Sequence, residues 1–465
     1  MFAGMSKLVY ASSFVTLATV LAFAMPLAAE EPPPDLGTRT AGVDWPDFLG
    51  PQRDSRSPET GILTDWAARP PRVVWQCELG ASYSAPSISR GRLFHFDRHG
   101  DVHRLTCRNS ETGGELWNYE LPADFSDMLG YNNGPRATPV VDGDRVYIMS
   151  PEGRLHCVRV TDGQRVWSVD TLAEFGVVKY FFGVGSTPVV WRDLLIANIG
   201  GSPADSPADV YAARGQVQGN GTGVVAFDKL TGKVRWQSTD ELASYASPVI
   251  AEISGAPRCF VFARGGLTVL DPATGKADFH FPWRATKLES VNASSPVVVG
   301  DEVFISESYG PASALLKVKA AGFDVVWQDD LRNRDKSMEL HWNTAVYHEG
   351  HLYGSSGQHG GSAELRCIEW RTGNVKWREP RLTRSSLLQA DGHFVCLSED
   401  GALRLLRATP DRFEQVAEFT PTGADGEPLL TYPAWAAPVL SHGLLYVRGS
   451  DRLVCLELIP ATANQ

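Results

Sequence analysis

The sequence predicts an all-β fold, an eight-bladed β-propeller of four-stranded antiparallel blades closed by an N-terminal strand. Three observations support this fold class. A Ser/Thr/Ala-Pro-Val motif recurs along the 465 residues. A Thr-Gly or Asp-Gly turn is followed four residues later by a large aromatic residue in several repeats. A spare strand near the beginning of the chain matches the strand that the last repeat lacks.

The first motif places a proline at the start of the innermost strand of each repeat. It occurs six times, at Pro86, Pro139, Pro188, Pro248, Pro296 and Pro438. The last two prolines are 142 residues apart, and two degenerate copies lie between them, at 344–346 and 386–388. Repeats of this length are typical of propeller blades, so the sequence predicts eight blades.

The second motif marks the hairpin that leads to the outermost strand. Its glycine supplies the positive φ of a tight turn, and the Thr or Asp before it bonds to its own backbone. Alternating apolar residues between the proline and this turn predict the short strands. The aromatic residue after the turn fills the wedge between neighbouring blades, at Trp117, Trp167, Trp236, Phe279 and Trp377.

The eighth repeat ends near residues 453–456 without an outermost strand. Residues 72–77 read as that missing strand, with Trp75 as its aromatic residue, and their pairing would protect both open edges. We expect Gln76 to lie opposite Cys455. The propeller then spans residues 44–460, with a short tail at 461–465.

The first residues are typical of a secretory signal peptide, predicted over 1–29. Lys7 precedes an apolar run at 8–24, and small residues follow up to Ala29. An uncleaved anchor is the alternative, although the run is short for one. We expect a flexible leader at 30–43, no membrane span after signal cleavage, and a periplasmic or secreted monomer.

Charge and cysteine spacing narrow the possible partners and cofactors. The net charge of −11 and the lack of a Lys/Arg run argue against nucleic acid. Cys107, Cys157 and Cys367 each lie ten residues before their repeat's aromatic residue, so they occupy equivalent positions in blades too far apart for disulfides. We expect buried free thiols. The histidines near His348 match no metal-ligand spacing, and we expect no metal site and no catalytic residue.

The segments leading into the innermost strands should converge on one end of the central channel, called here the funnel face. Their aromatic and cationic side chains suit a planar anion, a carbohydrate or a peptide segment. Alternatively, they merely plug the channel. We expect the insertion at 200–221 to extend over the funnel face, where it forms a lid, a loop that contacts a partner, or a flexible loop without such a role. The candidate ligand-binding residues are Tyr83, Tyr131, Asn132, Arg136, Lys179, Tyr180, Tyr245, Asn292, His341, Trp342, Arg384, Tyr432 and Trp435.

The Pro-Val-Val-x-Gly and Thr-Gly-x-x-x-Trp motifs resemble the pyrroloquinoline quinone (PQQ)-like repeat of eight-bladed propellers. That superfamily includes quinoprotein alcohol dehydrogenases and outer-membrane protein assembly factor propellers. The stretches 44–51 and 354–370 look similar to exported planctomycete proteins that carry the PQQ-binding-like repeat. The resemblance covers about residues 44–459.

For a dehydrogenase, the resemblance implies PQQ with Ca²⁺, an adjacent cysteine pair, Glu and Asn ligands and a catalytic Asp. No two cysteines are neighbours here, and no segment matches those ligand motifs. We therefore expect an exported, non-catalytic binding or scaffolding propeller without a cofactor, with an unknown protein or carbohydrate partner on the funnel face. The alternatives are a PQQ-dependent dehydrogenase of alcohols or sugars, and a carbohydrate-binding propeller.

Overall fold

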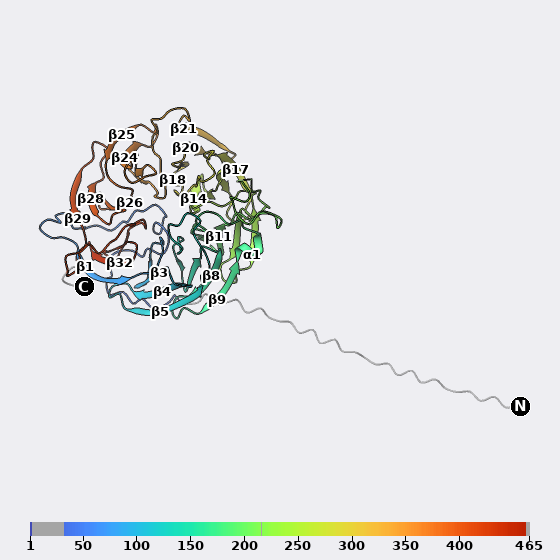
Figure 1. Cartoon of the computed structure of the whole chain (residues 1–465), viewed down its shortest axis with the longest axis horizontal. Helices are drawn as coiled ribbons and strands as arrows, with labels where there is room; N and C mark the ends of the chain where they lie inside the picture. The colour runs from blue at the N-terminus through green and yellow to red at the C-terminus, as the bar shows by residue number, and fades with distance from the viewer. Residues whose placement is uncertain (2–31, 215, 462–465) are drawn as a thin grey trace.

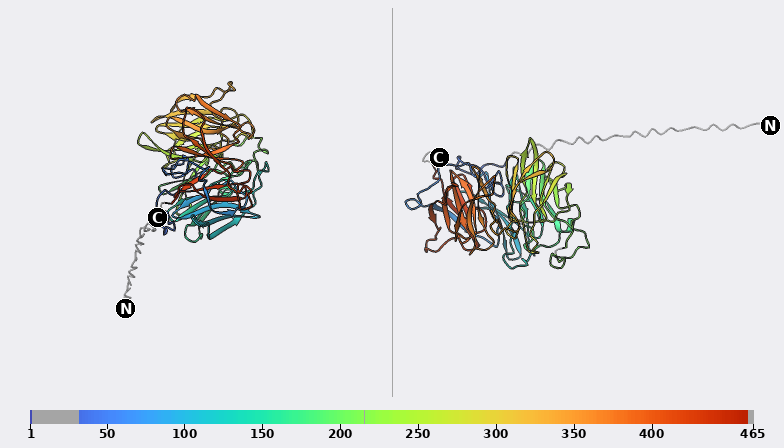
Figure 2. Two further views of the ribbon diagram at one scale, coloured as in Figure 1. Left: turned by 90° about the vertical axis from the view of Figure 1, so that its left-hand side faces the viewer. Right: turned by 90° about the horizontal axis from the view of Figure 1, so that it is seen from above.

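The computed structural model describes Met1 and residues 32–214 and 216–461. These residues form eight four-stranded antiparallel sheets around a central axis, with one short helix, α1 (Thr171–Phe175) (Figure 1). The predicted eight-bladed propeller is confirmed. Figure 2 gives two side views of the same sheets. Apart from Met1, the expected signal peptide lies outside the described residues, as do residues 462–465 of the expected tail.

The blades follow one another in chain order, and each runs from the channel outwards. Blades 1 to 4 comprise β2 (Ser87–Ser89), β3 (Arg92–His99), β4 (Val102–Asn109), β5 (Glu115–Pro122); β6 (Val140–Asp142), β7 (Arg145–Met149), β8 (Arg154–Arg159), β9 (Arg165–Asp170); β10 (Val189–Trp191), β11 (Leu194–Asn198), β12 (Val224–Asp228), β13 (Val234–Ser238); and β14 (Val249–Ile253), β15 (Ala256–Phe262), β16 (Gly266–Leu270), β17 (Ala277–Pro282). Blades 5 to 8 comprise β18 (Val297–Val299), β19 (Glu302–Ser306), β20 (Ser313–Val318), β21 (Phe323–Gln328); β22 (Val346–His348), β23 (His351–Ser356), β24 (Glu364–Glu369), β25 (Val375–Pro380); β26 (Ser385–Ala390), β27 (His393–Ser398), β28 (Leu403–Arg407), β29 (Gln415–Phe419); and β30 (Val439–Ser441), β31 (Leu444–Arg448), β32 (Arg452–Glu457), β1 (Arg72–Glu78).

The ring closes between the two ends of the chain. Strand β1 pairs antiparallel with β32, as predicted, and the two lie side by side near the C-terminus (Figure 1). The expected register was wrong, because Trp75 lies opposite Cys455 and Gln76 lies opposite Val454. An irregularity between Val73 and Trp75 shifts the pairing. The observed register sets the large ring opposite a small side chain, as Trp117 lies opposite Cys107 in blade 1.

Outer tryptophans join several blades to the next one. The Nε1–H of Trp117 in β5 donates to the carbonyl of Val160 in blade 2, at 2.9 Å. The ring also covers Gly163 of the blade 2 turn so closely that an added Cβ would lie 2.5 Å from it. The turn glycine is therefore needed for close approach as well as for its φ of 71°. The same contact joins Trp75 to Gly113, Trp167 to Gly232, Trp236 to Gly275 and Trp327 to Gly373.

Hydroxyl groups link the inner ends of five neighbouring blades. The backbone N–H of Thr138 donates to Thr187 Oγ1 at 2.9 Å, and that of Thr187 donates to Ser247 Oγ at 3.0 Å. The series continues from Ser247 to Ser295 and from Ser295 to Thr344, at 3.1 Å each. Each of these residues lies just before the proline position, two residues ahead of its innermost strand. These residues of the proline motif therefore bond blade to blade around the channel.

A segment ahead of β1, residues 43–57, crosses the middle of the ring (Figure 1). It hydrogen-bonds to the innermost strands of blades 1, 2 and 7. Arg53 pairs with Asp47 and donates to the carbonyls of Pro188 and Pro248, which belong to blades 3 and 4. We call residues 43–57 the crossing segment. No sequence motif had indicated it.

The stretch expected as a leader, 30–43, is described from residue 32 and lies against blades 1 and 8. The backbone amides of Thr38 and Arg39 donate to the carboxylate of Glu111, and Arg39 pairs with Glu457. No helix among the described residues is both long and apolar enough to cross a membrane. All seven cysteines are free, and six are buried, which confirms the expected thiols.

Candidate functional site

A cavity of about 480 Å³ opens at the funnel face, in the middle of the ring. We call it the cup. Its wall comes from the segments that lead into the innermost strands, together with loops beside them. Phe48, Leu49 and Ser55 of the crossing segment also line it and close its inner end. The channel is therefore blind on this side, and its own funnel side chains leave an open space.

The structure brings nine of the thirteen candidate residues to the cup: Tyr83, Tyr131, Arg136, Tyr245, His341, Trp342, Arg384, Tyr432 and Trp435. The other four lie elsewhere. The side chain of Asn132 accepts a hydrogen bond from the Gly134 amide. Buried Asn292 donates to two backbone carbonyls, those of Ala263 and Trp283. Lys179 and Tyr180 line a separate cavity of about 400 Å³.

Sequence reasoning missed further lining residues of two kinds. The first kind lies on loops between the second and third strands of blades 5 and 6, as Tyr309 and Gln358 do. The second kind is the hydroxyl residue next to the proline position of the repeat, at Thr187, Ser247, Thr344 and Ser386. The repeat alignment contained the signal for the hydroxyls, because they recur one residue before the proline position. Nothing in the repeat points to Phe48 and Leu49, which lie outside it.

Arg384 is held by a buried carboxylate on the wall of the cup. Its guanidinium lies 2.8 Å from Glu399 Oε2, the same oxygen that accepts a hydrogen bond from Trp435 Nε1 at 2.8 Å. It also donates to the carbonyl of Gln358 and lies 4.9 Å from the centre of the Trp435 ring. The charge of Arg384 is therefore compensated within the wall, and the guanidinium fixes the orientation of the indole.

Arg136 has the equivalent arrangement on the other side of the cup. Its guanidinium lies 2.6 Å from Asp127, whose side chain is completely buried. Burial lowers the pKa of Arg136, opposed first by the charge of Asp127. The guanidinium also lies 5.4 Å from the centre of the Tyr83 ring and 5.5 Å from that of Phe182. Its charge is thus paired inside the wall as well.

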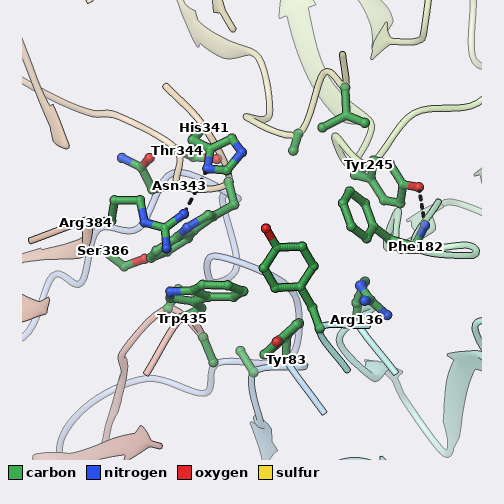
Figure 3. Close-up of a pocket in the computed structure, with 18 of the residues that line it drawn as sticks. Tyr83, Arg136, Phe182, Tyr245, His341, Asn343, Thr344, Arg384, Ser386 and Trp435 are labelled. Carbon is green, nitrogen blue, oxygen red and sulfur yellow. Dashed lines mark hydrogen bonds between the residues drawn. The ribbon is translucent and has the colours of Figure 1, made fainter. Parts of the chain in front are cut away.

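His341 joins these residues into a hydrogen-bonded network. One ring nitrogen, Nδ1, lies 3.3 Å from the Arg384 guanidinium (Figure 3). The other, Nε2, lies 3.0 Å from the Tyr309 hydroxyl. Because a guanidinium only donates, Nδ1 accepts and Nε2 carries the proton. Burial, followed by the charge of Arg384, lowers the pKa of His341 to about 3. The imidazole is neutral at physiological pH.

Aromatic rings form one continuous side of the cup. The centres of the Tyr83 and Trp435 rings are 4.8 Å apart, and those of Trp342 and Trp435 are 5.8 Å apart. Figure 3 shows Tyr83 and Trp435 side by side, facing the cavity. At the rim, Tyr131 and Tyr432 each keep 60% of their surface exposed. The cup therefore offers aromatic faces and neutral hydrogen-bonding groups.

The insertion at 200–221 packs behind the wall. Val210 is fully buried against Phe181 and Val291, and the Tyr211 ring meets Phe181 edge to face at 5.2 Å. None of the insertion's described residues lines the cup. Its contacts brace the wall segments from blades 3 and 5.

The lining of the cup can be tested against the quinone site that the resemblance implies. None of the seven cysteines lines the cup, and Glu289 is its one acidic lining residue. Within the described part of the chain, no three His, Cys, Asp or Glu side chains form a group that could hold a metal ion. The amide of Asn343 donates to the carbonyl of Ser355. These residues do not match the implied PQQ and Ca²⁺ site.

Comparisons with known proteins agree with the topology. The family model described as "Outer membrane protein assembly factor BamB" matches residues 59–202 and 188–328. BamB of Nitrosomonas eutropha is 23% identical over 213 residues, 39% of this chain and 46% of that protein. The dehydrogenase subunit of a quinone alcohol dehydrogenase from Gluconacetobacter polyoxogenes is 31% identical over 134 residues, 28% of this chain and 16% of that protein. The chain thus spans less than half the length of these curated relatives.

Solved structures show the same fold at low sequence identity. BamB from Moraxella catarrhalis has a TM-score of 0.55 at 13% identity, covering 84% of this chain and 99% of that one. Quinohemoprotein alcohol dehydrogenase from Comamonas testosteroni has a TM-score of 0.62 at 12% identity, covering 90% and 82%. Since the blades have the PQQ-like topology and the family model matches more than half of the residues, this chain belongs to the BamB-type family of PQQ-like propellers.

Proposed function

We propose that this protein is an exported, non-catalytic propeller that binds a ligand or a partner in the cup. The observation that carries the proposal is the cup itself, a blind cavity at the channel mouth, walled by aromatic rings. Concave sites of this size with a few oriented polar groups are the usual form of a binding site. The exposed rim residues Tyr131 and Tyr432 extend the aromatic surface outwards to a larger partner.

The electrostatics of the wall favour binding over catalysis. General acid–base catalysis works best with a group that titrates near the operating pH. The pKa of His341 is far below that range, and burial raises the pKa of Tyr83 to about 12. Arg136 and Arg384 are each engaged with a buried carboxylate. The assembly-factor names of the matching family and of the relative from Nitrosomonas eutropha further support a non-catalytic role in the cell envelope.

Site-specific photo-crosslinking in the native cell envelope tests the binding role. A photoreactive residue replaces Tyr131 at the rim of the cup, and the control replaces Leu331, which is 72% exposed and does not line the cup. We expect adducts of defined mass from position 131 only. Equal labelling at both positions, or none at either, would contradict the proposal.

Catalysis and export have their own tests. The purified protein is incubated with PQQ, Ca²⁺, an alcohol or sugar, and an artificial electron acceptor. We expect no substrate-dependent dye reduction, and sustained reduction would establish the dehydrogenase alternative. For export, we expect N-terminal sequencing of the protein from the periplasmic or secreted fraction to begin within a few residues after Ala29. Recovery of the uncleaved chain in the cytoplasm would refute this part.

A further inference from the structure

The cup has two chemically different sides. The residue one position before the proline position of the repeat carries a hydroxyl in blades 2 to 7, at Thr138, Thr187, Ser247, Ser295, Thr344 and Ser386. The same position is Ala85 in blade 1 and Ala437 in blade 8. Since blades 8 and 1 are neighbours at the closure, the two alanines make one apolar sector. Both alanines line the cup.

The hydroxyl side has unused hydrogen-bond donors. Thr187, Ser247 and Thr344 line the cup, and each hydroxyl oxygen accepts one backbone N–H from the preceding blade. A hydroxyl that accepts still has its own proton to donate. No acceptor among the described residues receives these protons. A bound N–H also polarises the hydroxyl and makes it a better donor. This side is therefore ready for a ligand with several oxygen acceptors.

The apolar side carries the stacked rings. Trp435 and Tyr83 each lie two residues before the alanine of their blade, and their centres are 4.8 Å apart. The Trp435 indole is held in place through its Nε1–H bond to Glu399. Figure 3 shows Trp435 and Tyr83 together on one side of the cavity, with Thr344 on a separate segment across from them. A ligand bound between the two sides needs one apolar face and one edge rich in oxygen.

The charges of the cup and of the whole protein limit the chemical class of the ligand further. Both guanidiniums of the wall are paired with buried carboxylates, and His341 is neutral, so none of these three side chains offers an anion a free positive charge. The protein as a whole carries a net charge of −11, which also repels anions. An entirely apolar ligand would leave the hydroxyl donors without water or an acceptor.

Resting on the proposed function, we propose that the cup binds a neutral saccharide. One sugar ring packs its C–H face on Trp435 and Tyr83 and directs its hydroxyls towards Thr187, Ser247 and Thr344. A pyranose has this division into an apolar face and a polar edge. The crossing segment limits the depth of the cup, so we place a single terminal or internal ring at its bottom.

The test begins with an array of neutral and anionic glycans probed with the full mature chain. Titration calorimetry of the best neutral glycan then compares two variants. Ser247→Ala and Ser295→Ala each remove one inter-blade hydrogen bond of similar length, 3.0 and 3.1 Å, from a buried serine. Only Ser247 lines the cup. We expect about fivefold weaker binding for Ser247→Ala and unchanged binding for Ser295→Ala.

A second pair of measurements checks the stacking of the ligand on Trp435 and the absence of charge on the ligand. We expect Trp435→Ala to weaken binding at least about tenfold, with folding checked by circular dichroism. The affinity of the wild type should be the same at low and high salt. Equal losses in the two serine variants, or binding of anionic glycans alone, would overturn the saccharide assignment. If no glycan binds while position 131 still crosslinks a partner, the saccharide assignment fails and the proposed function stands.

Discussion

At the scale of single residues, two glycines that each follow an aspartate in a turn play different roles. Gly143 and Gly163 both have positive φ, 58° and 71°. A Cβ on Gly143 would meet nothing within 4 Å, whereas one on Gly163 would collide with the Trp117 ring. The turn chemistry was predictable from the sequence. The contact with a ring from the previous blade was not, because it joins residues that lie 46 positions apart.

The two glycines make a matched pair of variants. We expect Gly143→Ala to lower the free energy of unfolding by about 1 kcal/mol, the cost of a left-handed conformation. Gly163→Ala adds overpacking against Trp117 and should cost about 3 kcal/mol. Urea unfolding followed by circular dichroism measures both. Equal losses of unfolding free energy in the two variants would show that the close approach of the Trp117 ring adds nothing to the cost of Gly163→Ala.

His341 predicts a pH dependence of stability. Its pKa is about 3 in the fold and about 6.5 in an unfolded chain. The unfolded state therefore binds the proton first, so the stability contributed by neutral His341 is complete above about pH 6.5 and is lost as the pH falls towards 3. We expect His341→Gln to show a smaller loss of unfolding free energy between about pH 7 and pH 4. Parallel pH profiles for the two proteins would contradict this.

At the scale of elements, the crossing segment decides the shape of the site. Leu49, Arg53 and Ser55 all have positive φ, at 62°, 55° and 55°, although none is glycine. Such conformations are costly and persist only where surrounding contacts hold them. Arg53 provides much of that hold through Asp47 and two backbone carbonyls. These contacts convert an open channel into a cup.

Removing the Arg53 side chain should release the crossing segment. We expect Arg53→Met to cost about 3–5 kcal/mol, because the Asp47 carboxylate and two carbonyls lose their partner. Adding Asp47→Asn should recover part of this loss. Hydrogen exchange should speed up at residues 44–57 while the strands of blades 3 and 4 stay protected. Unchanged protection of the segment would show that Arg53 does not hold it.

At the scale of the whole molecule, the ring is closed by hydrogen bonds between strands from opposite ends of the chain. Strand β1 is covalently continuous with blade 1 and pairs with β32 of blade 8. The Trp75 ring covers Gly113, and its Nε1–H donates to the carbonyl of Ser110 in blade 1 at 2.8 Å. The contacts of Trp75 with blade 1 match those of Trp117 with blade 2. Within blade 8, however, no direct chain connection joins β32 to β1.

Equivalent tryptophan variants compare the closing seam with an internal one. Trp75→Ala and Trp117→Ala each remove a ring and one Nε1–H bond, and each should cost about 3–5 kcal/mol. We expect Trp117→Ala to unfold in one transition at a lower midpoint. For Trp75→Ala, β1 should detach first, so circular dichroism and hydrogen exchange of β32 give different midpoints. Coincident transitions in both variants would show that closure is no weaker than any other seam.

The candidate site was only partly predictable. Tyr83, His341 and Trp435 reach the cup because each lies four or five residues before an innermost strand, and those strands line the channel of a propeller. Lys179 and Asn292 precede such strands too. Lys179 lines a different cavity, however, and the side-chain amide of Asn292 donates its hydrogen bonds to two backbone carbonyls. Position relative to a strand predicts the region of a side chain. It does not predict its direction, which depends on packing against neighbouring loops.

The sequence by itself determined the number of blades, their strand order and the strand that closes the ring. These features follow from local chemistry, namely a repeated turn, a repeated proline and alternating apolar residues, and each can be recognised within about 50 residues. The tertiary structure alone decided the bottom of the cup, the compensation of Arg136 and Arg384, and the register of β1. Arg53 shows the reason: its acceptors at Pro188 and Pro248 lie 135 and 195 positions away, and only closure of the ring brings them together.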